Sequence, residues 1–340
     1  MFPADFAYAR ARSLDEALDL LDEARAAGEE AKLIAGGQSL LPMMKLRLAA
    51  PQLLIDIADL RELGGGGWHG AADGTAAGPD PGYSIGALTT YRELGRSRLV
   101  NGALPVDHQG AAGPGGGIPA ITDALAVLAD PQVRARGTIG GAVAHGDPAA
   151  DLPAVLLALD AELTIVSRKP AAAGRRVIAL DDFLQGIYAT DLAEDEIITH
   201  VSIRTHGARG SAYEKFPHPA SHLPLAGVCA VVRLRDGRIE GAQVAVTGIS
   251  PRPYRARETE ALLAGVSPAP AILAAAAARV TAVPPATPTA PAARAPGAVT
   301  GAGSGRVTLL GDQHASAGYR AHLAEVLTRR ALARAAASAR

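Results

Sequence analysis

The sequence predicts an α+β protein of two or three domains, and three observations support this prediction. Its 340 residues are enough for several hydrophobic cores. Apolar residues make up 48% of the chain but aromatic residues only 4%, so Ala, Val, Leu and Gly must provide most of the packing. Short strand-like runs and helical patterns alternate in the first half, whereas the second half has the pattern of an antiparallel sheet followed by helices.

The first 60 residues predict a small β-α-β-α-β unit. Ser13 is a helix N-cap and Glu16 stands three residues later, which is the spacing of a capping box. Gly28 ends this helix. Buried strands are expected at residues 31–35 and 53–58.

The middle of the chain alternates between elements and Gly-rich loops. A loop or flexible hairpin is expected at 64–82, and a mobile loop at 105–117. Asp147 can cap a helix that has Pro148 at its first position and ends near Leu159. The other elements expected here are a strand leading into a helix at 83–94, a helix at 118–130 and a strand at 162–166.

The second half predicts an antiparallel sheet and a terminal helix. Strands are expected at 197–204 and 239–250, and a helix at 258–265. The Pro/Ala/Gly-rich residues 283–305 predict a linker or disordered loop. The last helix begins near Ser316, and its apolar face is expected to hold Tyr319, Leu323, Val326 and Leu327, with Arg320, His322, Arg329 and Arg330 outside.

Charge and cysteine content exclude several classes of function. The charges of the 33 basic and 34 acidic residues nearly cancel. The chain therefore has no excess positive charge that would indicate nucleic-acid binding. Cys229 is the only cysteine, which excludes an internal disulfide, a four-cysteine zinc site and an iron–sulfur cluster. The N-terminus lacks a signal-peptide pattern, and the apolar run at 268–283 is too short to span a bilayer. We therefore expect a cytoplasmic protein with no transmembrane segment.

The stretch Ala35-Gly36-Gly37-Gln38-Ser39 lies between a strand-like run and a helix-like start. It allows two interpretations, a plain tight turn or a loop whose backbone amides bind an anion. Glycines let the backbone approach a phosphate because no Cβ stands in the way. This motif alone does not decide between them.

A second diglycine loop follows about 100 residues later, at Gly137-Thr138-Ile139-Gly140-Gly141. It also places a glycine pair beside a hydroxyl residue. Together the two loops are typical of a pair that binds one pyrophosphate from two sides, which indicates a dinucleotide. Neither loop is the GxGxxG of the Rossmann fold.

Other polar residues give weaker signals. Asp151, early in the helix after the second loop, can accept hydrogen bonds from a ribose or simply pair with the helix dipole. Lys215 is a candidate for contact with a flavin or a phosphate. His218 and His222 have metal-ligand spacing, but the prolines around them exclude a helix, so no metal site is expected. No catalytic triad and no general acid or base can be assigned.

These motifs, in this order, resemble the FAD-binding medium subunit of the molybdenum hydroxylases, the family of aerobic carbon monoxide dehydrogenase and xanthine dehydrogenase. The resemblance covers most of the chain, and its main segments are "AGGQSLLPMMKLRLAAP", "DIADLREL", "IGALTTYREL", "ADPQVRARGTIGGAVAHGDPAADLPAVLLALDAEL" and "YEKFPHPAS".

The resemblance implies an FAD-binding module of the vanillyl-alcohol-oxidase (PCMH) type, with subdomains at 1–60 and 61–175, and a C-terminal α+β domain at 176–340. It implies that the two diglycine loops hold the FAD pyrophosphate, that Asp151 lies on the ribityl or ribose side, and that Lys215 and Ile198 lie near the flavin. The full set of implied FAD-binding residues is Leu33, Ile34, Ala35, Gly36, Gly37, Gln38, Ser39, Thr138, Ile139, Gly140, Gly141, Asp151, Ile198 and Lys215.

The chain departs from the family pattern at three positions. Ala135 and Ala142 stand where the family usually has Asn, and Leu223 stands where relatives often place an aromatic residue. These departures affect the expected geometry near the flavin more than they affect the two diglycine loops.

The resemblance also implies partner subunits. A large subunit would carry molybdopterin, a small subunit would carry two [2Fe–2S] clusters, and this chain would pass electrons through FAD to NAD, a quinone or oxygen. The alternatives are a stand-alone FAD-dependent oxidoreductase with its own substrate pocket, or a flavin-free scaffold subunit.

Overall fold

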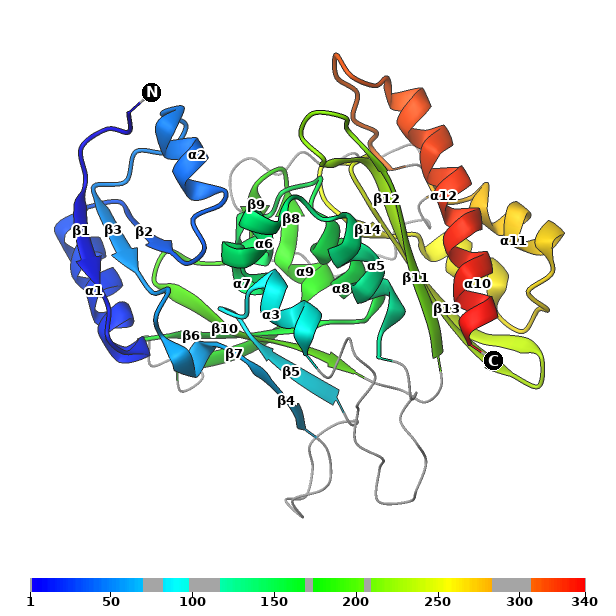
Figure 1. The fold of residues 1–340 in the computed structure, drawn as a ribbon, viewed down its shortest axis with the longest axis horizontal. Coiled ribbons are helices and arrows are strands. Elements are labelled where there is room, and N and C mark those ends of the chain that lie inside the picture. The colour runs from blue at the N-terminus through cyan, green and yellow to red at the C-terminus, as the bar shows by residue number, and fades with distance from the viewer. Residues whose placement is uncertain are drawn as a thin grey trace, which may run out of the picture.

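A computed structural model gives the fold of the chain (Figure 1). It describes residues 2–69, 82–97, 117–168, 174–204, 209–282 and 307–339. The loops predicted at 64–82 and 105–117 and the linker predicted at 283–305 lie largely outside these residues. In the described part of the chain, no helix combines the length and apolar character needed to cross a membrane.

The N-terminal part is a three-stranded parallel sheet with two helices, as the sequence predicts. The strand order is β1-β3-β2. Ser13 caps the first helix by accepting a hydrogen bond from the Glu16 amide, and Gly28 ends it in the left-handed conformation. The elements are β1 (Ala7–Arg10), α1 (Leu14–Ala27), β2 (Ala31–Ile34), α2 (Leu40–Lys45), β3 (Leu53–Asp56) and the 3-10 helix η1 (Arg61–Leu63).

The middle part is a five-stranded antiparallel sheet whose central strand comes late in the sequence. The order is β4-β5-β10-β6-β7, so β10 pairs with both β5 and β6. The sheet therefore continues past residue 175, where the sequence places a boundary, as far as Arg204. Its strands are β4 (Gly66–His69), β5 (Gly82–Gly86), β6 (Glu162–Ser167), β7 (Arg175–Ala179) and β10 (Glu196–Arg204).

Short helices cover one face of this sheet (Figure 1). The helix predicted to start at Asp147-Pro148 is α8, and it begins only at Asp151. The Asp147 carboxylate instead accepts the Ala149 amide in a tight turn, at 2.8 Å. The elements are α3 (Tyr91–Arg96), α5 (Pro119–Val127), α6 (Pro131–Arg136), α7 (Ile139–His145), α8 (Asp151–Ala158), α9 (Leu180–Phe183) and the hairpin strands β8 (Leu184–Gly186) and β9 (Ala189–Thr190).

The C-terminal part is an antiparallel sheet packed between two layers. One face, including Tyr213 and Cys229, shares a hydrophobic core with α5 and α8 of the middle part. The other face, including Ala212 and Val228, packs against the C-terminal helices. The elements are β11 (Arg209–Pro217), β12 (Pro224–Arg235), β13 (Arg238–Thr247), β14 (Tyr254–Arg255), α10 (Arg257–Leu263), α11 (Pro270–Ala277) and α12 (Ala317–Ser338).

The inward face of α12 differs from the predicted one at its first turn. The helix begins where expected, and Ser316 caps it by accepting the Tyr319 amide. Tyr319, however, is exposed, and Arg320 is buried. The Arg320 guanidinium donates hydrogen bonds to the carbonyl oxygens of Leu225 and Gly248, which anchors the helix to the sheet.

Candidate functional site

The two diglycine loops meet in space. The first follows β2, and the second begins α7. A Cβ atom added to Gly36 would collide with the backbone carbonyl of Arg136, and it would lie 3.0 Å from the Cα of Gly137. The loops can therefore approach each other this closely only because residue 36 has no side chain.

The first loop leaves backbone amides free to bind a ligand. Among the described residues, none accepts a hydrogen bond from the amides of Gly37, Gln38 and Ser39. The Gln38 side chain donates to the Gly36 carbonyl at 3.3 Å, which keeps the turn closed. Adjacent free amides on a bend form a binding site for an anion such as a phosphate.

The second loop is held in place by its neighbours. Thr138 caps α7 by accepting the Gly141 amide at 3.2 Å. The Ile139 amide donates to the Thr89 carbonyl and the Gly140 amide to the Ala87 carbonyl, so the loop is fixed to the segment that joins β5 to α3.

Both loops line one cleft between the N-terminal and middle parts, with a volume of about 560 Å³. The structure thus brings together most of the residues predicted to bind FAD. Those that line the cleft are Leu33, Ile34, Ala35, Gly36, Gly37, Gln38, Ser39, Thr138, Gly140, Gly141 and Ile198.

The other three predicted residues, Ile139, Asp151 and Lys215, are not among the lining residues. Ile139 is fully buried in the core beneath the second loop. Asp151 and Lys215 form a buried ion pair, with 2.9 Å between Nζ and Oδ2. Burial raises the pKa of Asp151, and the Lys215 ammonium and the hydrogen bond from the Tyr213 hydroxyl partly oppose this shift.

The cleft also contains ring side chains that the sequence analysis missed, from Tyr91, His145 and Tyr188. The rings of His145 and Tyr188 lie 4.9 Å apart between centroids, tilted by 39°. Burial lowers the pKa of His145 although Asp147 acts against this, so the imidazole is neutral at pH 7. Burial raises the pKa of Tyr91, as does the nearby Asp151. These residues come from three separate elements, so no local pattern could have grouped them.

One carboxylate on the cleft wall is held by an arginine. Arg176 donates to both oxygens of Glu196, at 2.8 and 2.7 Å, and also to the Asp191 carboxylate. Burial acts to raise the pKa of Glu196, but the hydrogen bonds and the charge of Arg176, together with the hydrogen bond from the Ala193 amide, outweigh it and the pKa is lowered. Glu196 is therefore a fixed negative charge beside the cleft.

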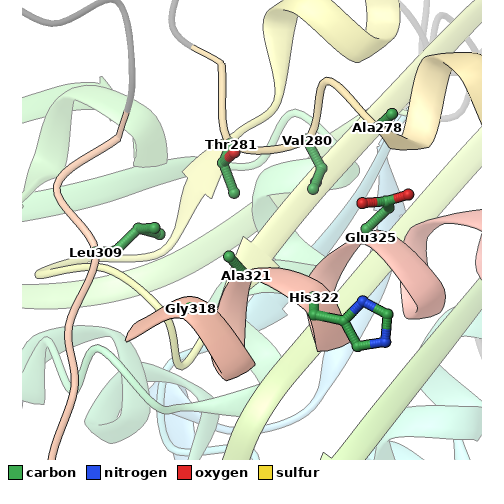
Figure 2. Close-up of a pocket in the computed structure, with 8 residues that line it drawn as sticks. All are labelled: Ala278, Val280, Thr281, Leu309, Gly318, Ala321, His322 and Glu325. Atoms are coloured by element: carbon green, nitrogen blue, oxygen red, sulfur yellow. The ribbon is translucent and has the colours of Figure 1, made fainter. Parts of the chain in front are cut away.

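A second, smaller hollow of about 320 Å³ lies in the C-terminal part, beside α12 (Figure 2). His322 and Glu325 come from one helix, and Thr281 and Leu309 lie across from it (Figure 2). Its lining contains no second basic or acidic group from another element to pair with these two, so it does not form a catalytic constellation.

Comparison with known protein families identifies the chain. The family described as "FAD binding domain in molybdopterin dehydrogenase" matches residues 4–204, which is more than half of the chain. The chain belongs to this family. Residues 211–296 match a second family, the "CO dehydrogenase flavoprotein C-terminal domain".

Individual relatives agree with this assignment over the whole length. The chain is 31% identical to the carbon monoxide dehydrogenase medium chain of Afipia carboxidovorans, covering 100% of each protein. It is 32% identical to the 6-hydroxypseudooxynicotine dehydrogenase complex subunit alpha of Paenarthrobacter nicotinovorans, covering 100% of this chain and 97% of the relative. A solved structure of carbon monoxide dehydrogenase from Hydrogenophaga pseudoflava superposes with a TM-score of 0.78 at 33% identity, covering 99% of each chain.

The chain is therefore an FAD subunit of the molybdenum hydroxylase family, an oxidoreductase subunit whose cofactor is FAD. The predicted fold class and family resemblance are confirmed. The cleft fits this cofactor, because free amides at a glycine bend match the diphosphate of FAD and apolar side chains such as Leu33, Met43 and Ile198 match its rings.

Proposed function

We propose that the chain is the FAD-carrying member of a three-subunit enzyme. In this proposal a small partner with [2Fe–2S] clusters delivers electrons, and a large partner with molybdopterin oxidises the substrate. Bound FAD can accept electrons singly or in pairs, which suits a relay between clusters and a two-electron acceptor. The observation that carries the proposal is the shared cleft of the two diglycine loops.

The cysteine content supports the need for partners. Cys229 is the single cysteine, and it lies fully buried in the sheet core, where burial raises the pKa of its thiol. A cluster needs several cysteine ligands, so the iron–sulfur centres must belong to another chain. In the described residues, no group of three or more His, Cys, Asp or Glu side chains is placed to hold a metal ion.

We assign roles to the chain's own residues as follows. The amides of residues 37–39 and the loop at 138–141 hold the FAD diphosphate. Leu33, Ile34, Ala35 and Ile198 pack against the cofactor. Asp151 and Lys215 form a buried ion pair behind the cleft wall, near Tyr91, and support the wall from there.

We also propose a domain division that differs from the one implied by the sequence. The first FAD subdomain covers residues 1–60. The second extends to about residue 204, because β10 is the central strand of its sheet. The C-terminal domain then starts with β11 and carries the 283–305 segment.

The electron acceptor that we expect is NAD, a quinone or oxygen, and the compartment that we expect is the cytoplasm.

The test is purification of the chain both alone and with its native partners under mild conditions. We expect the chain alone to show flavin absorbance but no substrate oxidation. The native complex should contain FAD, iron and molybdenum and should bleach the flavin band when substrate is added without acceptor. Substrate turnover by the chain alone would favour a stand-alone oxidoreductase, and absence of flavin from chain and complex would favour a scaffold.

A further inference from the structure

The segment 145–151 links the cleft to the C-terminal sheet. At one end His145 lines the cleft, and its ring packs against Tyr188. The Gly146 carbonyl accepts the Tyr188 amide at 3.1 Å. At the other end Asp151 begins α8 and is buried. The segment therefore contacts the cofactor cleft on one side and the C-terminal sheet on the other.

The end of β13 holds the centre of this segment. The Thr247 hydroxyl lies 2.8 Å from the Pro148 carbonyl oxygen and 3.0 Å from that of Ala150. The Gly248 amide also donates to the Pro148 carbonyl, at 2.8 Å. Thr247 is fully buried, whereas Pro148 and Ala150 are partly buried, so the hydroxyl makes both contacts from inside the protein.

Strand β11 holds the Asp151 end. The Tyr213 hydroxyl donates to Oδ1 of Asp151 at 2.6 Å, and the Lys215 ammonium donates to Oδ2 at 2.9 Å. A Cβ atom at Gly227 on β12 would collide with the Tyr213 hydroxyl, so this glycine leaves the room that the hydroxyl occupies. The packing of the sheet is thus arranged around this hydrogen bond.

Asp151 in turn lies close to the cleft wall. Its charge acts on Tyr91, which lines the cleft. The Tyr91 ring packs against Gly137, and its amide donates to the Gly137 carbonyl at 2.9 Å. Tyr91 therefore lies between the surroundings of Asp151 and the start of the second diglycine loop.

We propose that Tyr213 and Thr247 are positioning residues for FAD binding, which act through the 145–151 segment. The proposal rests on the function proposed above. The C-terminal sheet fixes this segment through its own hydrogen bonds, so FAD binding does not have to meet the cost of ordering it. Loss of either hydroxyl should weaken FAD binding without removing any direct contact.

The experiment compares Tyr213→Phe and Thr247→Val with matched controls in the core between the C-terminal sheet and the C-terminal helices. Tyr254→Phe removes a buried hydroxyl that donates to the Val280 carbonyl at 2.9 Å, and Thr259→Val removes one that donates to the Ala276 carbonyl at 3.0 Å. For each purified full-length chain, FAD is removed, thermal unfolding is measured, and FAD is titrated back while flavin fluorescence and absorbance are recorded.

We expect Tyr213→Phe and Thr247→Val each to raise the FAD dissociation constant about tenfold, as loss of one hydrogen bond to a charged or buried group would do. They should also change the fluorescence of the bound flavin. The two controls should unfold at similarly lowered temperatures but bind FAD like the unaltered chain. Thr247→Ser keeps the hydroxyl and should restore the affinity.

Equal dissociation constants for the cleft-side variants and their controls would overturn this inference and leave the FAD function intact. An unaltered chain that takes up no FAD would overturn the proposed function, and this inference with it.

Discussion

At the scale of single residues, the backbone of Gly36 is one place where two distant parts of the chain touch. The glycine pairs and their hydroxyl neighbours are visible in the sequence, so the loops could be predicted. The contact of Gly36 with the Arg136 carbonyl could not, because it depends on how two separate folding units pack together.

The pairing of Asp151 with Lys215 shows a second limit. The sequence marks each residue as a candidate for cofactor contact, yet the structure places both in a buried pair with Tyr213. The partners of Asp151 lie on β11, more than 60 residues further along the chain, and no spacing rule connects them. The sequence thus predicts a role for each residue at the cofactor site but does not reveal the interaction between them.

His145 gives a prediction at this scale. Burial lowers its pKa in the folded chain, so the unfolded chain binds a proton more readily. The free energy of unfolding should therefore fall as the pH drops from about 7 to about 5, through the ordinary histidine range. His145→Gln removes the titrating group, so the variant should lose less stability over this range.

Urea unfolding of the FAD-free chain at the two pH values measures this difference. The same loss of stability in the variant and in the unaltered chain would show that His145 does not titrate as its burial implies.

At the scale of elements, the cap of α7 gives a second prediction. Thr138 accepts the Gly141 amide, and an N-cap hydroxyl contributes about 1 kcal/mol. Thr138→Ala should lower the free energy of unfolding by about that amount and weaken FAD binding, because the second loop is the first turn of this helix. Thr138→Ser keeps the cap and should change neither quantity by more than about 0.5 kcal/mol.

Denaturant unfolding and FAD titration of both variants provide the test. If Thr138→Ala behaved like Thr138→Ser in both measurements, the cap would not be what orders the second loop.

The elements themselves were largely predictable where local chemistry defines them. Ser13 and Gly28 mark α1 at both ends, and Thr90 with Glu93 forms a capping box that opens α3. The prediction was wrong at the start of α8, because Asp147 uses its carboxylate in a local turn. It was also wrong for Arg320, because a buried arginine satisfied by carbonyl groups resembles a surface residue in the sequence.

At the scale of the whole molecule, apolar cores join the middle part to both neighbouring parts of the chain. Leu88 and Ile197 of the middle part share a core with α1 and β3 of the N-terminal part. On the opposite side, Tyr213 and Cys229 share a core with the helices of the middle part. Arg168 also forms ion pairs with Asp15 and Asp19, which connect the middle part to the N-terminal part at the surface. Exposed ion pairs of this kind contribute little to stability.

The arrangement of the strands was the least predictable feature at this scale. The run at 197–204 has the same alternating pattern as the strands after it, so the sequence predicts that it belongs to the C-terminal sheet. Its pairing with β5 and β6 is non-local, and only the packed structure reveals it.

The central claim is that FAD lies where the two diglycine loops meet, and the FAD dissociation constant of Gly36→Ala tests it most directly. Gly318→Ala is the control, since a Cβ there meets open space. We predict that Gly36→Ala binds FAD about 10- to 100-fold more weakly, the effect of forcing a methyl group into a tight contact, while Gly318→Ala binds normally. Equal affinity of Gly36→Ala and the unaltered chain would contradict the account.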